Sequence, residues 1–161
     1  FRTANSPVVT DDMIFIGTRQ KPVMAFHIGP SGVSDSNVAW KWDDDGGPDV
    51  PTPVTDGKYY YMVADNGLIT CVDAKTGEKI YRNRLSVGAT IDSSPILADG
   101  KLYITGENAV TVVLAAGPEY KELARNELDG TFTMSSLAVS GKQIFLRTST
   151  HLYCLGEQPA H

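Results

Sequence analysis

The sequence predicts an all-β protein, a β-propeller of four consecutive four-stranded blades of which the last is incomplete. Three observations support this fold class. The chain resembles itself about every 43 residues. Each repeat contains short runs rich in Val, Ile, Leu, Tyr and Phe, bounded by Gly, Asp, Asn or Pro, which is typical of β-strands. No helical periodicity persists anywhere in the chain.

A turn before an aromatic-rich run marks each repeat. The turn residues Asp12, Gly57, Gly100 and Gly141 are 45, 43 and 41 residues apart. Two of these turns read Asp-Gly, a strong hairpin signal because glycine accepts the positive φ of a tight turn. A β-sandwich is the alternative, but a sandwich has no reason to repeat its turn chemistry at a fixed period. In a domain spanning residues 1–161, we expect blades at about 6–45, 50–86, 93–129 and 134–156.

The strands follow in order within each repeat. In the first blade we expect strands near residues 6–11, 13–18, 22–28 and 37–42, with corresponding runs at the repeat offsets. The third strands read KPVMAFHI, GLITCVDA, AVTVVLAA and THLYCLG. The fourth strands read NVAWKW, EKIYRNRL and YKELARNEL, and the last repeat has no fourth strand.

One segment of the second repeat, CVDAKTGEKIY, resembles a known motif. It is similar to the A-x-D-x-x-T-G-x-x-x-W repeat of propellers of the pyrroloquinoline-quinone type. That repeat occurs in quinoprotein alcohol dehydrogenases and in the propeller lipoprotein of the outer-membrane assembly machinery. The full motif appears once, because the first copy has an insertion before its Trp and the third copy lacks both Asp and Trp. The resemblance implies the propeller fold and says little about chemistry.

The motif residues have structural roles that the sequence predicts. Asp73 and Thr76 can hydrogen-bond the backbone amides of their turn, while Gly77 supplies a left-handed residue. Tyr81 and Trp40 are expected to pack between neighbouring blades.

The end of the chain is expected to leave the fourth blade with three strands, ending at about Leu155. Residues 156–161 cannot form the missing strand, because they are few and Pro159 lacks a backbone donor. We interpret the chain as the C-terminal half of a seven- or eight-bladed ring. Its expected partner is the missing N-terminal half of the same propeller or a second copy of the chain. The first residue is Phe, not Met, so we expect the gene product to start upstream.

The bulk composition excludes some partners. The net charge is −5 and no run of Lys or Arg occurs. Nucleic acid is therefore not an expected partner, since binding phosphates requires clustered positive charge. No apolar stretch approaches the ~18–20 residues that a membrane-spanning helix needs.

The two cysteines occupy the same position of the repeat. Cys71 and Cys154 align with Ala25 and Val113 in the other copies, so the position should be a narrow slot inside the sheet packing. We expect both thiols to be reduced and buried. A disulfide is not expected, because equivalent sites two blades apart exceed the ~4.4–6.8 Å between Cα atoms that a disulfide requires.

No metal or catalytic site is expected from the residue pattern. His27, His151 and His161 lie in different contexts, without the spacing of a metal site. The acidic run at residues 43–47 lacks the register of a calcium loop and is expected to be a solvated turn. No G-x-S-x-G motif occurs, and the serines cluster at strand starts, where hydroxyls cap turns.

Arg147 and His151 form the one candidate contact site. Arg147 stands where the first repeat has Gly17, at the end of a second strand, and His151 follows across the next hairpin. One hypothesis is a spot that recognises a small anion or a peptide. The other is that Arg147 pairs with a backbone carbonyl or an acidic residue of the next blade.

Two function classes remain. The first is a non-catalytic propeller that serves as a scaffold or as a binding module for proteins or small ligands, without a cofactor. The second is a dehydrogenase with pyrroloquinoline quinone and calcium on the propeller axis, for which the resemblance implies an axial Trp platform and adjacent cysteines. Trp40 and Trp42 lie at outer-strand positions, and no adjacent cysteine pair exists. By resemblance, the compartment is the periplasm or another site outside the cytoplasm.

Overall fold

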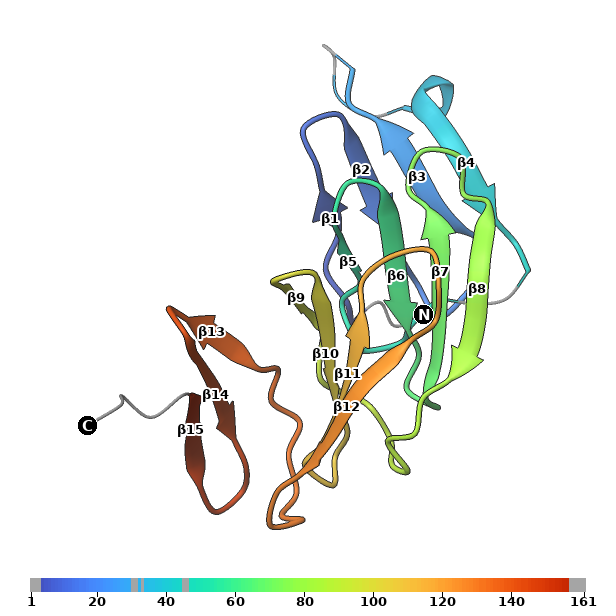
Figure 1. The fold of residues 1–161 in the computed structure, drawn as a ribbon. Helices are drawn as coiled ribbons and strands as arrows, with labels where there is room; N and C mark the ends of the chain where they lie inside the picture. Colours follow the sequence, from blue (N-terminus) through green and yellow to red (C-terminus); the bar gives the residue numbers. More distant parts are fainter. Residues whose placement is uncertain (1–3, 30–31, 33, 45–46, 157–161) are drawn as a thin grey trace.

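The computed structural model describes residues 4–29, 32, 34–44 and 47–156, and these form four antiparallel sheets arranged one after another (Figure 1). Three sheets have four strands and the fourth has three, always in sequential order. The chain is therefore an all-β partial propeller with four blades, as the repeat predicts. A single turn of 3₁₀ helix, η1 (Asp35–Asn37), lies in the insertion before the last strand of the first blade.

The strands have the following bounds. Blade 1 comprises β1 (Val8–Val9), β2 (Met13–Ile16), β3 (Val23–His27) and β4 (Val38–Trp42). Blade 2 comprises β5 (Val54–Thr55), β6 (Tyr59–Val63), β7 (Leu68–Asp73) and β8 (Lys79–Arg84). Blade 3 comprises β9 (Ile96–Ala98), β10 (Lys101–Thr105), β11 (Val110–Ala115) and β12 (Glu122–Glu127). Blade 4 comprises β13 (Ala138–Ser140), β14 (Gln143–Arg147) and β15 (Leu152–Gly156).

The register repeats from blade to blade. The second and third strands pair Phe15 with Ala25, Tyr61 with Cys71, Tyr103 with Val113 and Phe145 with Cys154. In each of the first three blades the pairing to the fourth strand shifts directly after this third-strand residue. Such a bulge bends the strand and increases its twist. The sequence repeat is thus an exact structural repeat, so residues at equivalent positions can be compared directly.

The core lies between the blades. Phe15 of blade 1 stacks on Tyr60 of blade 2, with 4.7 Å between ring centroids. Between blades 2 and 3, Tyr61 and Cys71 pack with Leu102 and other buried side chains. Because a middle blade is covered on both faces, all five residues of β6 are buried. Burying each large apolar side chain contributes about 1.5–3 kcal/mol, so the packing between blades stabilises the fold.

A row of hydroxyl groups also links the blades where their first strands begin. The Ser6 backbone N–H donates to Thr52 Oγ1 at 3.0 Å. The Thr52 N–H donates to Ser94 Oγ at 2.9 Å, and the Ser94 N–H donates to Ser136 Oγ at 2.9 Å. These four residues, the hydroxyl ladder, occupy one repeat position. Blades 2, 3 and 4 thereby each accept one hydrogen bond from the blade before them.

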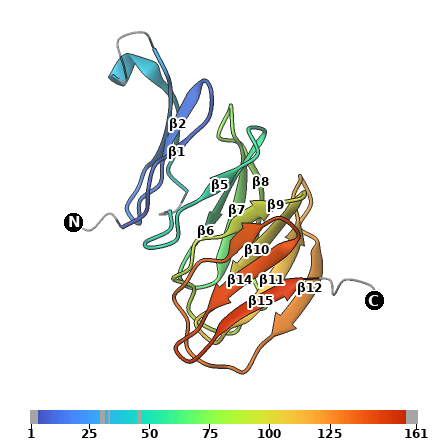
Figure 2. The ribbon, with the colours of Figure 1, turned by 90° about the vertical axis from the view of Figure 1, so that its left-hand side faces the viewer.

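Blade 4 has three strands, and β15 ends at Gly156, one residue beyond the predicted end. Its tail, residues 157–161 with Pro159, lies outside the described residues. Figure 2 looks onto β14 and β15, and no other described element covers them from this side. Leu152 is 73% exposed there, whereas Thr111, at the same register position of blade 3, is buried.

Candidate functional site

The motif turn of blade 2 is held by its own aspartate. Asp73 Oδ1 accepts hydrogen bonds from the backbone N–H groups of Lys75 and Thr76, each at 2.9 Å, and from Thr76 Oγ1 at 3.2 Å. Desolvation alone would raise the pKa of Asp73, but the hydrogen bonds from Thr76 and Lys75 outweigh it and lower that pKa. Gly77 has φ of +73°, in the left-handed region that favours glycine. The carboxylate is thus occupied in building the turn.

The aromatic residues of the motif connect neighbouring blades. Trp40 of blade 1 is buried, and its Nε1 donates to the Ala74 carbonyl of blade 2 at 2.9 Å. Tyr81 of blade 2 packs edge-on against Tyr120 of blade 3, with 5.9 Å between ring centroids. Trp42 is buried at the end of the outermost strand. These side chains serve inter-blade packing.

The two cysteines differ in exposure, and the prediction that both are buried is wrong for Cys154. Cys71 is fully buried, and this burial raises the pKa of its thiol to about 12. Cys154 occupies the same position but is exposed, because no described blade follows blade 4. Ala25, Cys71 and Val113 are each covered by the blade that follows. Both cysteines are free thiols.

Arg147 lines a hollow of about 270 Å³ beside the connection between blades 3 and 4. Phe132 and Met134 of that connection line the same hollow, together with Thr148 and Ser149 of the following turn. Within the described part of the chain, the Arg147 guanidinium makes no hydrogen bond or ion pair. The hollow therefore combines an unpaired cation with apolar surface.

His151 lies in different surroundings. Its Nδ1 is 3.0 Å from Asp129 Oδ2 and 2.8 Å from Thr150 Oγ1, and its ring contacts Tyr153. Hydrogen bonds from Tyr153 and from Thr131 hold the pKa of Asp129 at about 2. His151 does not line the hollow at Arg147, so the structure does not bring the two predicted residues into one site. A joint role in ligand contact stays a prediction.

Two apolar side chains on the rim were not identified from the sequence. Phe132 is 52% exposed and Met134 is 53% exposed, both in the connection from blade 3 to blade 4. The Phe132 carbonyl accepts from the Ser149 N–H at 2.8 Å, as the Thr90 carbonyl accepts from the Glu107 N–H one blade earlier. The repeat therefore aligns Phe132 with Thr90 and Met134 with Asp92. This alignment replaces two polar residues of one repeat with two large apolar residues of the next, and that difference in the sequence could have identified Phe132 and Met134.

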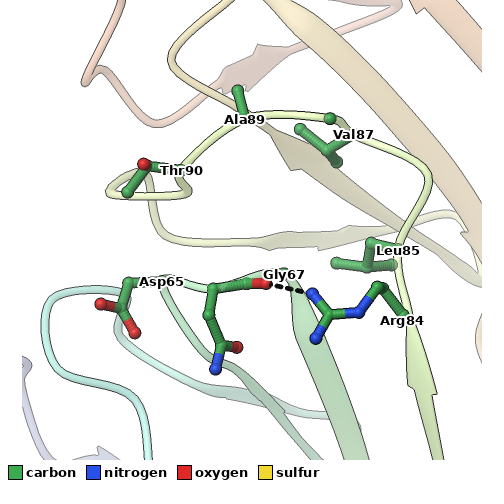
Figure 3. A pocket seen from close by; sticks show the side chains of 9 residues that line it. Asp65, Gly67, Arg84, Leu85, Val87, Ala89 and Thr90 are labelled. Carbon is green, nitrogen blue, oxygen red and sulfur yellow. Dashed lines mark hydrogen bonds between the residues drawn. The ribbon is translucent and has the colours of Figure 1, made fainter.

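A second hollow, of about 380 Å³, lies on the same rim between blades 2 and 3 (Figure 3). Asp65 and Arg84 line its two sides, with Val87 and Ala89 on the blade connection opposite. Arg84 Nη1 donates to the Asn66 carbonyl at 2.7 Å, which holds the turn closed. Thr90 is the one hydroxyl side chain in the lining of this hollow, and Asp65 is its one carboxylate.

The described residues contain no group of three or more His, Cys, Asp or Glu side chains that could hold a metal ion. The acidic run at 43–47 is described except for Asp45 and Gly46, which lie outside the described residues. Asp44 forms an ion pair with Lys79 at 2.7 Å. None of the helical structure described is long and apolar enough to cross a membrane.

A family model matches most of the chain. Residues 30–150 match the family described as outer membrane protein assembly factor BamB. No curated protein matches the chain at a significant level in sequence.

Solved structures with the same fold include both assembly factors and enzymes. BamB from Moraxella catarrhalis superposes with a TM-score of 0.71 at 12% identity, covering 93% of this chain and 41% of that one. The quinohemoprotein alcohol dehydrogenase ADHIIG from Pseudomonas putida HK5 gives 0.68 at 16% identity, covering 89% and 28%. A europium-containing methanol dehydrogenase gives 0.64 at 14% identity, covering 81% and 26%. The chain thus spans less than half the length of each, and likeness at these identities shows the fold alone.

Proposed function

We propose that the chain, which belongs to the family of outer membrane protein assembly factor BamB, is part of a non-catalytic β-propeller. We propose further that this propeller binds other proteins outside the cytoplasm. The observation that carries this proposal is the pair of exposed apolar side chains on the rim of blade 4, Phe132 and Met134. Exposed large side chains that gather on one loop favour protein contact.

The fold itself does not require apolar residues at these positions. Blade 3 has Thr90 and Asp92 there, and its connection makes the same backbone hydrogen bonds. Thr90 is exposed although complete blades lie on both sides of it, so Phe132 should stay exposed in a complete ring. Burial of Phe132 against a partner would contribute about 1.5–3 kcal/mol.

Completion of the ring is part of the same proposal. The chain covers 41% of the length of BamB from Moraxella catarrhalis. Blade 1 and blade 4 each have one sheet face without a described neighbour, and no strand among the described residues pairs with the outer edge of β15. The remainder of the propeller or a second copy would cover these faces, since unpaired strand edges favour association.

The alternative function is quinone-dependent dehydrogenation, favoured by the dehydrogenases among the structural neighbours. The residues described here do not fit a site for quinone and calcium. Trp40 and Trp42 are buried on outermost strands, where Trp40 bonds the next blade, so neither is an axial platform. Adding the quinone and calcium to the full-length protein should give no spectral change and no dye reduction, whereas either signal would favour the enzyme.

Site-specific photo-cross-linking tests the binding proposal. A photoreactive amino acid at position 132 should cross-link a protein in the envelope of the source cell. The same amino acid at position 90, the equivalent position of blade 3, is the matched control. Cross-links from position 90 but none from position 132 would contradict the proposal, and recovery of the protein from the cytoplasmic fraction would contradict the location.

A further inference from the structure

The face of blade 4 that no described element covers has a defined composition. Ala138, Phe145, Arg147, Leu152 and Cys154 share it by strand alternation and register, and we call it the open face. The equivalent faces of blades 1 and 2 are covered by the following blade. Tyr103 and Thr111 on the equivalent face of blade 3 line a small cavity together with Ile144 and Leu146 of blade 4. These internal interfaces therefore show what an occupant of the open face must supply.

The hydroxyl ladder gives the first requirement. In three blades a backbone N–H at the start of the first strand donates to a Ser or Thr hydroxyl of the following blade. The next donor in the series is the Ser136 N–H, which has no acceptor among the described residues. A backbone donor that becomes buried needs a partner. The occupant should therefore present a hydroxyl to Ser136.

Arg147 gives the second requirement. Its equivalents in blades 1, 2 and 3 are Gly17, Val63 and Thr105, and all three are buried. A Cβ on Gly17 would lie 3.3 Å from Tyr60 Oη and 3.4 Å from Pro53 Cγ of blade 2, so the following blade lies directly over this position. An occupant of the open face will therefore cover Arg147. Covering an unpaired guanidinium is strongly unfavourable unless a carboxylate or carbonyl groups pair with it.

A second copy of this chain meets the first requirement but not the second. It would offer Ser6 Oγ to the Ser136 N–H, since Ser6 holds the ladder position of blade 1. Ile14 and Pro7 of blade 1 occupy the repeat positions of Tyr60 and Pro53 of blade 2. If blade 1 of a second copy packed on the open face as blade 2 packs on blade 1, its Ile14 and Pro7 would lie over Arg147. Neither residue can pair with a cation. The adjoining turn of blade 1, residues 17–22, contains two cationic residues and no acidic one.

We propose that the open face of blade 4 binds a further blade of the same propeller, which presents a Ser or Thr hydroxyl to the Ser136 N–H and a carboxylate to Arg147, and that it does not bind a second copy of this chain. This inference rests on the proposed completion of the ring, and it selects one of the two sources named for the covering blade. The open face borders the protein-binding rim, because Arg147 also lines the hollow beside Phe132 and Met134, but Phe132 itself lies outside the open face.

A disulfide cross-link tests which sheet the open face accepts. Ser6→Cys and Ser136→Cys would be combined in a chain carrying Cys154→Ala, the residue that blade 1 has at that position. In a head-to-tail pair the two new thiols would be adjacent, so mild oxidation would trap the pair. Ile14→Glu then supplies the carboxylate that the second copy lacks, and Ile14→Gln is the matched neutral control. Ile14 lies on the uncovered face of blade 1, so near-UV circular dichroism should show an unchanged fold.

The expected result is little cross-linked dimer with the native residues at positions 14 and 147. Ile14→Glu should increase the dimer yield at least about tenfold, and Ile14→Gln should not. Adding Arg147→Glu should remove the gain, and the exchanged pair Ile14→Lys with Arg147→Glu should restore it.

Efficient cross-linking of the chain with native Ile14 and Arg147 would overturn the proposal. Equal yields for Ile14→Glu and Ile14→Gln would overturn the assignment of a carboxylate to Arg147. Neither outcome changes the cross-linking expected from position 132, so the two proposals fail separately.

Discussion

Replacing Gly77 with alanine is expected to lower the free energy of unfolding by about 2–5 kcal/mol. Two separate penalties contribute. Gly77 has φ of +73°, and an L-residue other than glycine costs roughly 1–2 kcal/mol in the left-handed region. The new Cβ would also lie 2.7 Å from Trp40 Cδ2 and 2.8 Å from Trp40 Cγ. Overpacking of this kind costs about 1–3 kcal/mol when the neighbour cannot move.

Trp40 has little freedom to relieve that contact. Its Nε1 donates to the Ala74 carbonyl, and its ring packs against Phe15 and Tyr60 with centroid distances of 6.0 and 6.3 Å. A shift of the indole would therefore break a buried hydrogen bond or open the packing between blades 1 and 2. The cost of the substitution should appear as separation of these two blades.

Urea denaturation followed by tryptophan fluorescence measures this effect. Gly57→Ala is the matched control, because Gly57 has φ of +85° but open space around its would-be Cβ. Gly57→Ala should therefore lower the free energy of unfolding only by the cost of the left-handed backbone conformation, roughly 1–2 kcal/mol. In a chain carrying Trp40→Leu, the excess cost of Gly77→Ala over Gly57→Ala should disappear. Equal destabilisation by the two glycine substitutions in the native chain would refute the argument that Trp40 docks on this turn.

Three further predictions follow from the same structure. Thiol titration of the folded chain should show rapid reaction at the exposed Cys154 and slow reaction at the buried Cys71, and two rapid reactions would contradict the packing of blade 3 on blade 2. The pKa of Asp129 is about 2 in the fold, below its unfolded value, so its stabilising effect is present above about pH 4 and is lost as the pH falls toward 2. Asp129→Asn should remove that part of the acid dependence in denaturation curves between these pH values, and an unchanged pH profile would refute the assignment. Exchanging Phe132 for Thr and Met134 for Asp, the residues of blade 3, should leave the free energy of unfolding within about 0.5 kcal/mol and reduce binding of a hydrophobic dye. A loss of several kcal/mol would show that these side chains belong to the core.

The sequence by itself determined the blades and their register. Turn residues such as Gly57 and Gly100 recur because a hairpin needs positive φ at that point, and this requirement is local. The alignment of Ala25, Cys71, Val113 and Cys154 could be read directly from the repeat, and the structure shows these four residues at one register position. Period, turn chemistry and strand composition all act within one blade, so the sequence of one blade carries them.

Only the tertiary structure decided what each blade contributes to its neighbours. Cys71 and Cys154 are identical in repeat position, yet one is buried and the other exposed, because burial depends on a following blade. Arg147 and His151 lie at the two ends of one turn, but His151 bonds to Asp129 and leaves Arg147 without a partner in the described structure. Contacts between blades join residues far apart in the sequence, such as Trp40 with Ala74 and the Ser94 N–H with Ser136 Oγ. Such contacts depend on the angle between packed sheets, and no local pattern in the sequence encodes that angle.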